Sequence, residues 1–175
     1  MSDKIRRVFV EKKKEYAVEA AGLCSDLQQT LGLKNLKSVR IVNRYDLEGL
    51  TDEEYQQARS LVLSEAPGDV VRDEELEIPA GFRSFAVELL PGQYDQREDF
   101  AAQCIQAITQ GQRPIVAAAK VFLLEGDLSD ADFEKIKHYC INPVEAQEAA
   151  IDKPDTLDMT WDVPKPVAVL DGFRA

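Results

Sequence analysis

The sequence predicts an α+β protein made of two similar halves, each in the order strand, helix, strand, helix. Two observations carry this prediction: an internal repeat with a constant offset, and apolar periodicities that alternate between those of strands and helices. The composition is that of a globular domain, with 45% hydrophobic and 30% charged residues. A chain of 175 residues is long enough to form a stable hydrophobic core without disulfides or metal ions. We therefore expect antiparallel-rich sheets covered by helices, followed by an extended C-terminal linker.

The repeat is anchored by two short identities. Val-Glu at 10–11 recurs at 87–88, and Leu-Glu-Gly at 47–49 recurs at 124–126, so both offsets are 77 residues (87 − 10 and 124 − 47). Asp127 is then one extra residue, and the offset of the following segment becomes 78. Because four segments share nearly one offset, we expect both halves to adopt the same fold.

Strands are expected where β-branched and aromatic residues cluster. These clusters cover 5–11, 38–47 and 69–76 in the first half, and 84–90 and 114–124 in the second. The last of them carries a single charge and is expected to be a buried central strand. The 38–47 strand places Arg40 and Arg44 on one face, which we expect to reach solvent or a partner.

Helices are expected from apolar stripes and capping residues. The stripes of the first helices are Ala20, Leu23, Leu27 and Leu31, and Phe100, Cys104, Ile105 and Ile108. Gly32 and Gly111 stand where left-handed C-caps are expected. The second helices begin with capping-box patterns, Thr51 followed by Glu54, and Ser129 followed by Asp132.

These elements predict three regions: a first half (1–78), a second half (82–142) and a proline-rich linker (143–175). A sheet with helices on one face needs cover on its other face, and we expect each half to supply that cover for the other, as in a pseudo-dimer. Trp161 in the linker is expected to anchor it on the body. A linker normally connects two domains, and this one has no second domain after it in the sequence. We therefore expect the chain to be one domain of a larger protein.

Charge and cysteine content exclude several classes of partner. The net charge of −11 argues against nucleic acid, because nucleic-acid binding relies on cationic neutralisation. No apolar run has the length of a membrane span or of a signal peptide. Cys24, Cys104 and Cys140 lack metal-ligand spacing, and we interpret them as buried free thiols in a reducing cytoplasm. No metal or cofactor site is expected.

One polar corner is the candidate site. It follows the 84–90 strand, and its candidate residues are Pro91, Gly92, Gln93, Asp95, Gln96 and Arg97. Pro-Gly suits a type II turn, and Asp95 suits an N-cap with Glu98 as its capping-box partner. A second interpretation remains open, because three long side chains at a helix N-terminus can hold an anion or the backbone of a partner.

The remaining chemistry is sparse. His138 precedes Cys140 by two residues, so their helical side chains point apart and the histidine is expected at the surface. A third hypothesis is a small enzyme in which Glu88 or Glu125 acts as a general acid or base. Because Glu125 repeats an acid at a strand end of the first half, a folding role is favoured for it.

With these residues assembled, the chain resembles the N-terminal region of the phosphoribosylformylglycinamidine synthase family, in its long single-chain form. The resembling segments follow one another in order: RRVFVEKKKEYAVEA, VRIVNRYDLEGLTDEEY, FAVELLPGQYDQREDFAAQCIQ, KVFLLEGDLSDADFEKIKHYCINPVEAQEA and DKPDTLDM. The resemblance implies two tandem PurS-like, ferredoxin-like βαβ units that match the fused dimer of the family's small subunit.

The resemblance also implies a parent reaction, in which ATP and glutamine convert formylglycinamide ribonucleotide (FGAR) to formylglycinamidine ribonucleotide (FGAM) in purine biosynthesis. The family's ATP, magnesium and glutaminase motifs do not occur in this sequence, so no catalytic residue carries over. The implied role is a scaffold that joins the synthetase and glutaminase domains of the same chain, with the 91–97 corner as a substrate-side or partner-contact loop. The alternative is a free-standing ferredoxin-like module that binds or senses a small metabolite.

Overall fold

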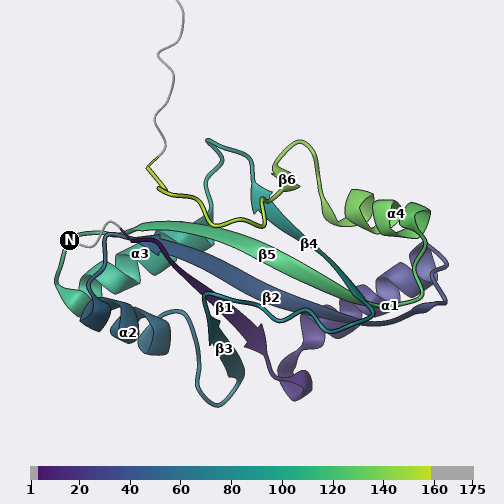
Figure 1. Ribbon diagram of the computed structural model, residues 1–175, viewed down its shortest axis with the longest axis horizontal. Helices are drawn as coiled ribbons and strands as arrows, with labels where there is room; N and C mark the ends of the chain where they lie inside the picture. Colours follow the sequence, from purple (N-terminus) through teal and green to yellow (C-terminus); the bar gives the residue numbers. More distant parts are fainter. Residues whose placement is uncertain (1–3, 159–175) are drawn as a thin grey trace, which may run out of the picture.

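The computed structural model describes residues 4–158, and there the chain has the α+β class that its sequence predicts (Figure 1). This part of the chain contains six strands and four α-helices, which alternate except where β4 follows β3 directly. The strands are β1 (Arg6–Lys12), β2 (Leu36–Glu48), β3 (Asp69–Asp73), β4 (Phe82–Leu89), β5 (Ile115–Gly126) and β6 (Ala146–Glu148). The α-helices are α1 (Val18–Thr30), α2 (Asp52–Leu61), α3 (Gln96–Thr109) and α4 (Asp130–Cys140).

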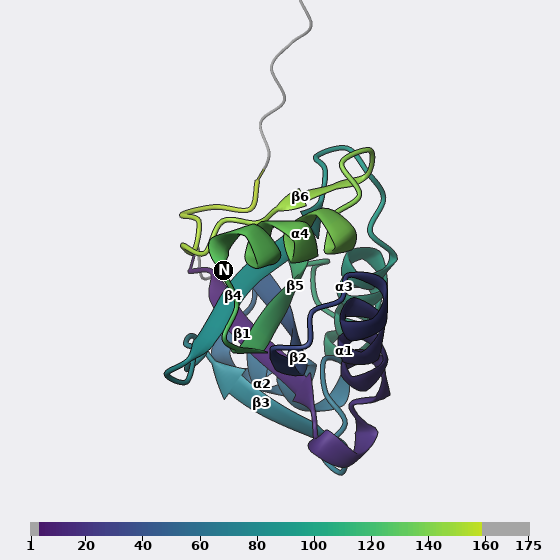
Figure 2. The same cartoon turned by 90° about the vertical axis from the view of Figure 1, so that its right-hand side faces the viewer.

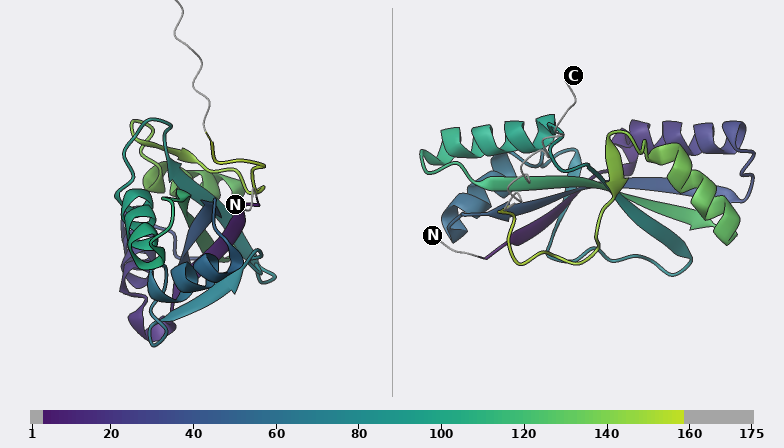
Figure 3. Two further views of the ribbon diagram at one scale, coloured as in Figure 1. Left: turned by 90° about the vertical axis from the view of Figure 1, so that its left-hand side faces the viewer. Right: turned by 90° about the horizontal axis from the view of Figure 1, so that it is seen from above.

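The strands form one antiparallel sheet in the order β3-β1-β2-β5-β4-β6. The expectation of two sheets covering one another is therefore wrong, because the halves join edge to edge through β2 and β5 (Figure 3). Pairing at these edges satisfies two long rows of backbone groups that separated halves would leave open.

Strand pairing is the same in the two halves. Val10 lies opposite Asn43 in the β1–β2 pair, and Val87 lies opposite Lys120 in the β4–β5 pair. Each residue of the second pair follows its counterpart by 77 positions (87 − 10 and 120 − 43), which is the offset of the sequence repeat.

The short strand β6 extends this correspondence past residue 142, where the predicted second half ends. Val71 of β3 lies opposite Val10, and Glu148 of β6 lies opposite Val87, so the offset is again 77 (148 − 71). Residues 149–158, the C-terminal strap, continue across the sheet, whereas residues 159–175 of the expected linker, Trp161 included, lie outside the described residues.

The helices lie on one face of the sheet, with α1 and α3 on the same side in both perpendicular views (Figures 2 and 3). At one end, α2 and α3 pack on β1, β2 and β5 around Leu47, Tyr55 and Ile105. At the other end, α1 and α4 pack on β2, β4 and β5 around Leu27 and Phe122. The helix face of the sheet therefore carries two cores.

Most of the predicted helix ends and stripes hold, but Phe100, Ile108 and Gly111 are exceptions, and Ile108 is 39% exposed. Thr51 and Glu54 form the complete capping box, and the Ser129 hydroxyl accepts a hydrogen bond from the backbone N–H three residues on. Phe100 is 64% exposed, because α3 is rotated so that it buries the alanines and isoleucine at 101, 102 and 105 instead. Gln110, not Gly111, adopts the left-handed conformation after α3.

The other face of the sheet is covered by extended and loop segments rather than by helices. An apolar patch that includes Phe9, Val42 and Leu123 lies under the C-terminal strap and under the loop of residues 74–81. Arg44 lies on this face and is 7% exposed, so the expectation that it reaches solvent is wrong. No helix within residues 4–158 has the length and apolar character needed to cross a membrane.

Candidate functional site

The candidate site forms where β4 leaves β5. The β4–β5 ladder ends at Val87 and Lys120, after which β4 pairs only with β6. β5 continues beside β2 as far as Ile115. The two strands therefore diverge, and the backbone of β5 near Ala118 has no β4 partner.

The predicted turn follows this divergence. The N–H of Gln93 donates to the carbonyl oxygen of Leu90 over 3.0 Å, and Gly92 has a φ of 89°. A positive φ at the third position, after Pro91, is the mark of a type II turn, so this prediction is confirmed. The turn leads the chain from β4 towards the N-terminus of α3.

Asp95 caps α3 as the sequence predicts. Its Oδ1 accepts hydrogen bonds from the backbone N–H groups of Arg97, at 2.7 Å, and Glu98, at 3.4 Å. Glu98 is not the capping-box partner that was expected. Its Oε1 instead accepts from the N–H of Ala118 over 2.8 Å, and so satisfies the β5 backbone where β4 has moved away.

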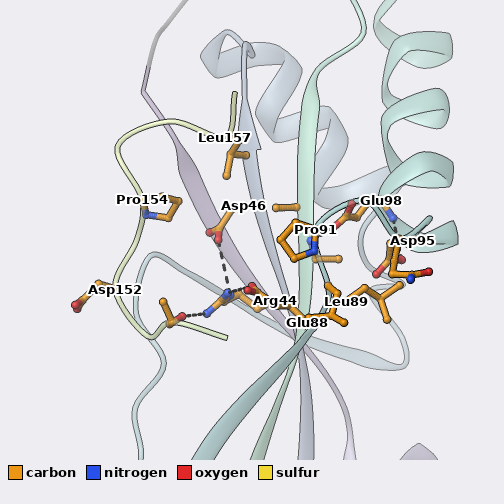
Figure 4. Close-up of a pocket in the computed structure, with 16 residues that line it drawn as sticks. Arg44, Asp46, Glu88, Leu89, Pro91, Asp95, Glu98, Asp152, Pro154 and Leu157 are labelled. Atoms are coloured by element: carbon orange, nitrogen blue, oxygen red, sulfur yellow. Dashed lines mark hydrogen bonds and ion pairs between the residues drawn. The ribbon is translucent and has the colours of Figure 1, made fainter. Parts of the chain in front are cut away.

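A pocket of about 300 Å³ lies between the diverging strands, the turn and the C-terminal strap (Figure 4). This volume is at the lower end of those that hold small molecules. Four of the candidate residues from the sequence line it: Pro91, Gly92, Gln93 and Asp95.

The other two candidates do not line this pocket. Gln96 and Arg97 line a separate, more open hollow, together with Lys120. Arg97 Nη1 donates to Oδ1 of Asn43 on β2 over 3.2 Å. The three long side chains of the corner are therefore divided between two surfaces and do not form one anion-binding group.

The sequence did not identify the residue at the centre of the pocket. Arg44 extends from β2 into it, and Asp46 and Glu88 lie beside the guanidinium (Figure 4). Asp152 and Leu157 of the strap form the wall across from the turn. The available signal was a pair of opposite charges two residues apart on one strand, Arg44 and Asp46, which places both on the same face of the sheet. Only the order of the strands shows that they meet Glu88 and the turn.

The electrostatics of the pocket are dominated by carboxylates around one cation. Burial, reinforced by the neighbouring charge of Arg7, holds the pKa of Arg44 below its ordinary value despite the acids near it. Burial also raises the pKa of Glu98, and the carboxylates of Asp95 and Glu88 raise it further. An ammonium group near these acids would therefore be stabilised, as would an acceptor for the guanidinium.

The remaining candidates lie apart from one another. His138 is exposed on α4, as expected. Cys24, Cys104 and Cys140 are free thiols, but each is only partly buried, so the expectation that they are buried is wrong. Glu125 accepts a hydrogen bond from the Ser38 hydroxyl over 2.7 Å, which is a structural role. Arg40 is only partly exposed and is bound to Glu11 by two hydrogen bonds. Between residues 4 and 158, no three acidic, histidine or cysteine side chains gather into a group able to hold a metal ion.

Comparison with known families and with curated proteins gave no match: no protein-family model fits the chain, and no curated sequence is similar to it.

Proposed function

We propose that this chain is the N-terminal assembly domain of a phosphoribosylformylglycinamidine synthase, the ATP- and glutamine-dependent ligase that converts FGAR to FGAM. In this proposal it has no catalytic residue of its own. It holds the synthetase and glutaminase domains of the same chain in position, and the synthetase part binds ATP, magnesium and FGAR.

The pairing of β2 with β5 is the observation that carries the proposal. Asn43 lies opposite Lys120, and these residues are 77 positions apart, so each faces its own counterpart in the repeat. In a two-fold symmetric interface, the residue on the axis faces its own copy. This register therefore supports a fused dimer of two small subunits, the arrangement that the sequence resemblance implies for this family.

The shared pairing of the outer strands supports the same proposal. Both β1–β3 and β4–β6 add an edge strand at the same offset, so each half is a complete β-α-β-α-β unit. A dimer of such units presents two pairs of helices on one face of the sheet and two covering segments on the other, and this is what an assembly domain needs in order to contact more than one domain.

The first test is the mass of the native protein in its source cell, detected with an antibody raised against this chain. We expect a single species much heavier than 19.6 kDa, because the synthetase and glutaminase domains would belong to the same polypeptide. A native species of 19.6 kDa would contradict the proposal and would favour the free-standing module.

A second test uses the corner residue Arg97 in the assembled enzyme. Arg97→Ala should clearly lower the rate of FGAM formation but lower the melting temperature only slightly. The effect on stability is small because the hydrogen bond from Arg97 to Asn43 is only partly buried. Arg59→Ala, which removes an ion pair to Asp73 at the edge of the sheet, is the matched control and should leave activity unchanged. Equal losses of activity and stability in Arg97→Ala would argue for a purely structural turn.

A further inference from the structure

We propose that the pocket between β4, β5 and the C-terminal strap binds a free α-amino acid. The carboxylate of the ligand would bind to Arg44, and its ammonium group would lie among the surrounding acidic side chains. This site is separate from the assembly role and does not depend on it.

Arg44 is a buried cation with most of its donors unused. A guanidinium has five N–H donors, and within residues 4–158 this one makes a single side-chain hydrogen bond, from Nη1 to the carbonyl oxygen of Ala150 at 2.6 Å. Its Nε lies 3.7 Å from Oδ2 of Asp46, and its Nη2 lies 3.8 Å from Oε2 of Glu88. Both contacts are ion pairs longer than a hydrogen bond (Figure 4), so within the described part of the chain Nε and Nη2 have no hydrogen-bonded acceptor.

The nearest acid is already committed to another arginine. Asp46 accepts a hydrogen bond from Arg7 Nε at 2.6 Å and another from Arg7 Nη2 at 2.8 Å. Both carboxylate oxygens are therefore bound in a two-point contact, which is the strongest geometry for this type of pair. Arg44 consequently shares a carboxylate whose favoured positions are occupied.

The repeat provides an internal control for whether the fold requires these charges. The counterparts of Arg7, Arg44 and Asp46 in the second half, 77 residues on, are Ser84, Val121 and Leu123. The same sheet position is thus built without any ionised group. Burying charges costs free energy relative to apolar residues of similar size, so the charged version has a role other than forming the sheet.

The charges around Arg44 select the class of ligand. Glu88, Asp95, Glu98 and Asp152 line the same pocket, so its walls would repel a simple anion. A simple cation would be attracted by these acids, but it would leave the free donors of Arg44 without an acceptor. An α-amino acid carries a carboxylate and an ammonium group on one carbon, and so offers each kind of wall the opposite charge. A pocket of about 300 Å³ admits a molecule of this size.

Isothermal titration calorimetry with the 175-residue chain tests the proposal. Each of the twenty common amino acids is titrated separately, and for any that bind, the matching amine without a carboxylate and the matching acid without an amino group follow. We expect saturable binding of at least one amino acid, and a loss of affinity of about tenfold or more for both analogues, because each removes one charge-assisted contact. Absence of saturable binding by all twenty would overturn the proposal, and so would equal binding of either analogue.

Variants separate the site from the fold. Arg44→Met removes the guanidinium but keeps an unbranched apolar stem, and Glu88→Gln keeps the shape of the side chain at a partly exposed position, so the second remains informative if the first fails to fold. Both should weaken binding about tenfold or more. Arg40→Met is the control, because this arginine lies on the same strand and binds Glu11 outside the pocket. Unchanged affinity in folded Glu88→Gln and Arg44→Met proteins would refute the assignment.

Discussion

Replacing Arg7 with methionine should lower the free energy of unfolding by about 3–5 kcal/mol, because it leaves a buried carboxylate without its partner. Asp46 is 3% exposed, and both of its oxygens are bound by Arg7 at 2.6 and 2.8 Å. The nearest remaining cation is Arg44, at 3.7 Å, which offsets part of the loss and favours the lower end of this range. The same substitution also removes the 2.6 Å hydrogen bond from Arg7 to the carbonyl oxygen of Ile151 in the strap.

The matched variant replaces both members of the pair with the residues of the second half. Arg7→Ser combined with Asp46→Leu introduces the side chains of Ser84 and Leu123, which the same fold already holds at the equivalent positions. Because the buried carboxylate is removed together with its partner, and Arg44 keeps its ion pair with Glu88, we expect most of the stability to return. Urea unfolding followed by circular dichroism measures both variants. A cost below about 1 kcal/mol for Arg7→Met, or a double variant as unstable as the single one, would refute this account.

Three further outcomes are expected. Thr51→Ala should cost about 1 kcal/mol of stability by opening the capping box with Glu54, whereas Thr51→Ser should cost little in the same urea assay. Burial raises the pKa of Glu11, but the hydrogen bonds and charge of Arg40 help to outweigh it, so the net pKa is lowered. The stability that Glu11 contributes is therefore present above about pH 4.3 and is lost as the pH falls, and Glu11→Gln should reduce the slope of stability against pH below that value; an unchanged slope would contradict this. Burial raises the pKa of Cys140 to about 11, so at about pH 8 iodoacetamide should modify it about 100-fold more slowly than an unstructured cysteine peptide. Mass spectrometry of the labelled peptides measures the rates, and equal rates would contradict the assignment.

Local features of the fold could be predicted because they depend on neighbouring residues. The type II turn at Pro91-Gly92 and the cap at Thr51 each rest on a few side chains whose geometry is set within four residues. The rotation of α3 could not be predicted in the same way. Phe100 and Ile105 both fit an apolar stripe, and only the position of α2 decides which of them is buried.

The joint between the halves and the pocket depend on the order of strands, which periodicity does not encode. The apolar pattern of 114–124 predicts a buried strand, but it does not name β2 as the neighbour. β6 has three residues in a proline-flanked segment, too short for a periodic signal. The offset of 78 that follows Asp127 leads from Val71 to residue 149, whereas the strand pairing returns to an offset of 77 at Glu148.

The joint between β2 and β5 has a consequence for synthesis on the ribosome. β2 is complete at residue 48, but its partner is not complete until residue 126, which is 78 residues later (126 − 48). At about 5–20 residues per second, that interval lasts about 4–16 s. During it the nascent chain exposes a 13-residue strand edge, able to pair with the same edge of another nascent chain. Neighbouring ribosomes on one message therefore bring together open β2 edges that can pair with each other before β5 is available.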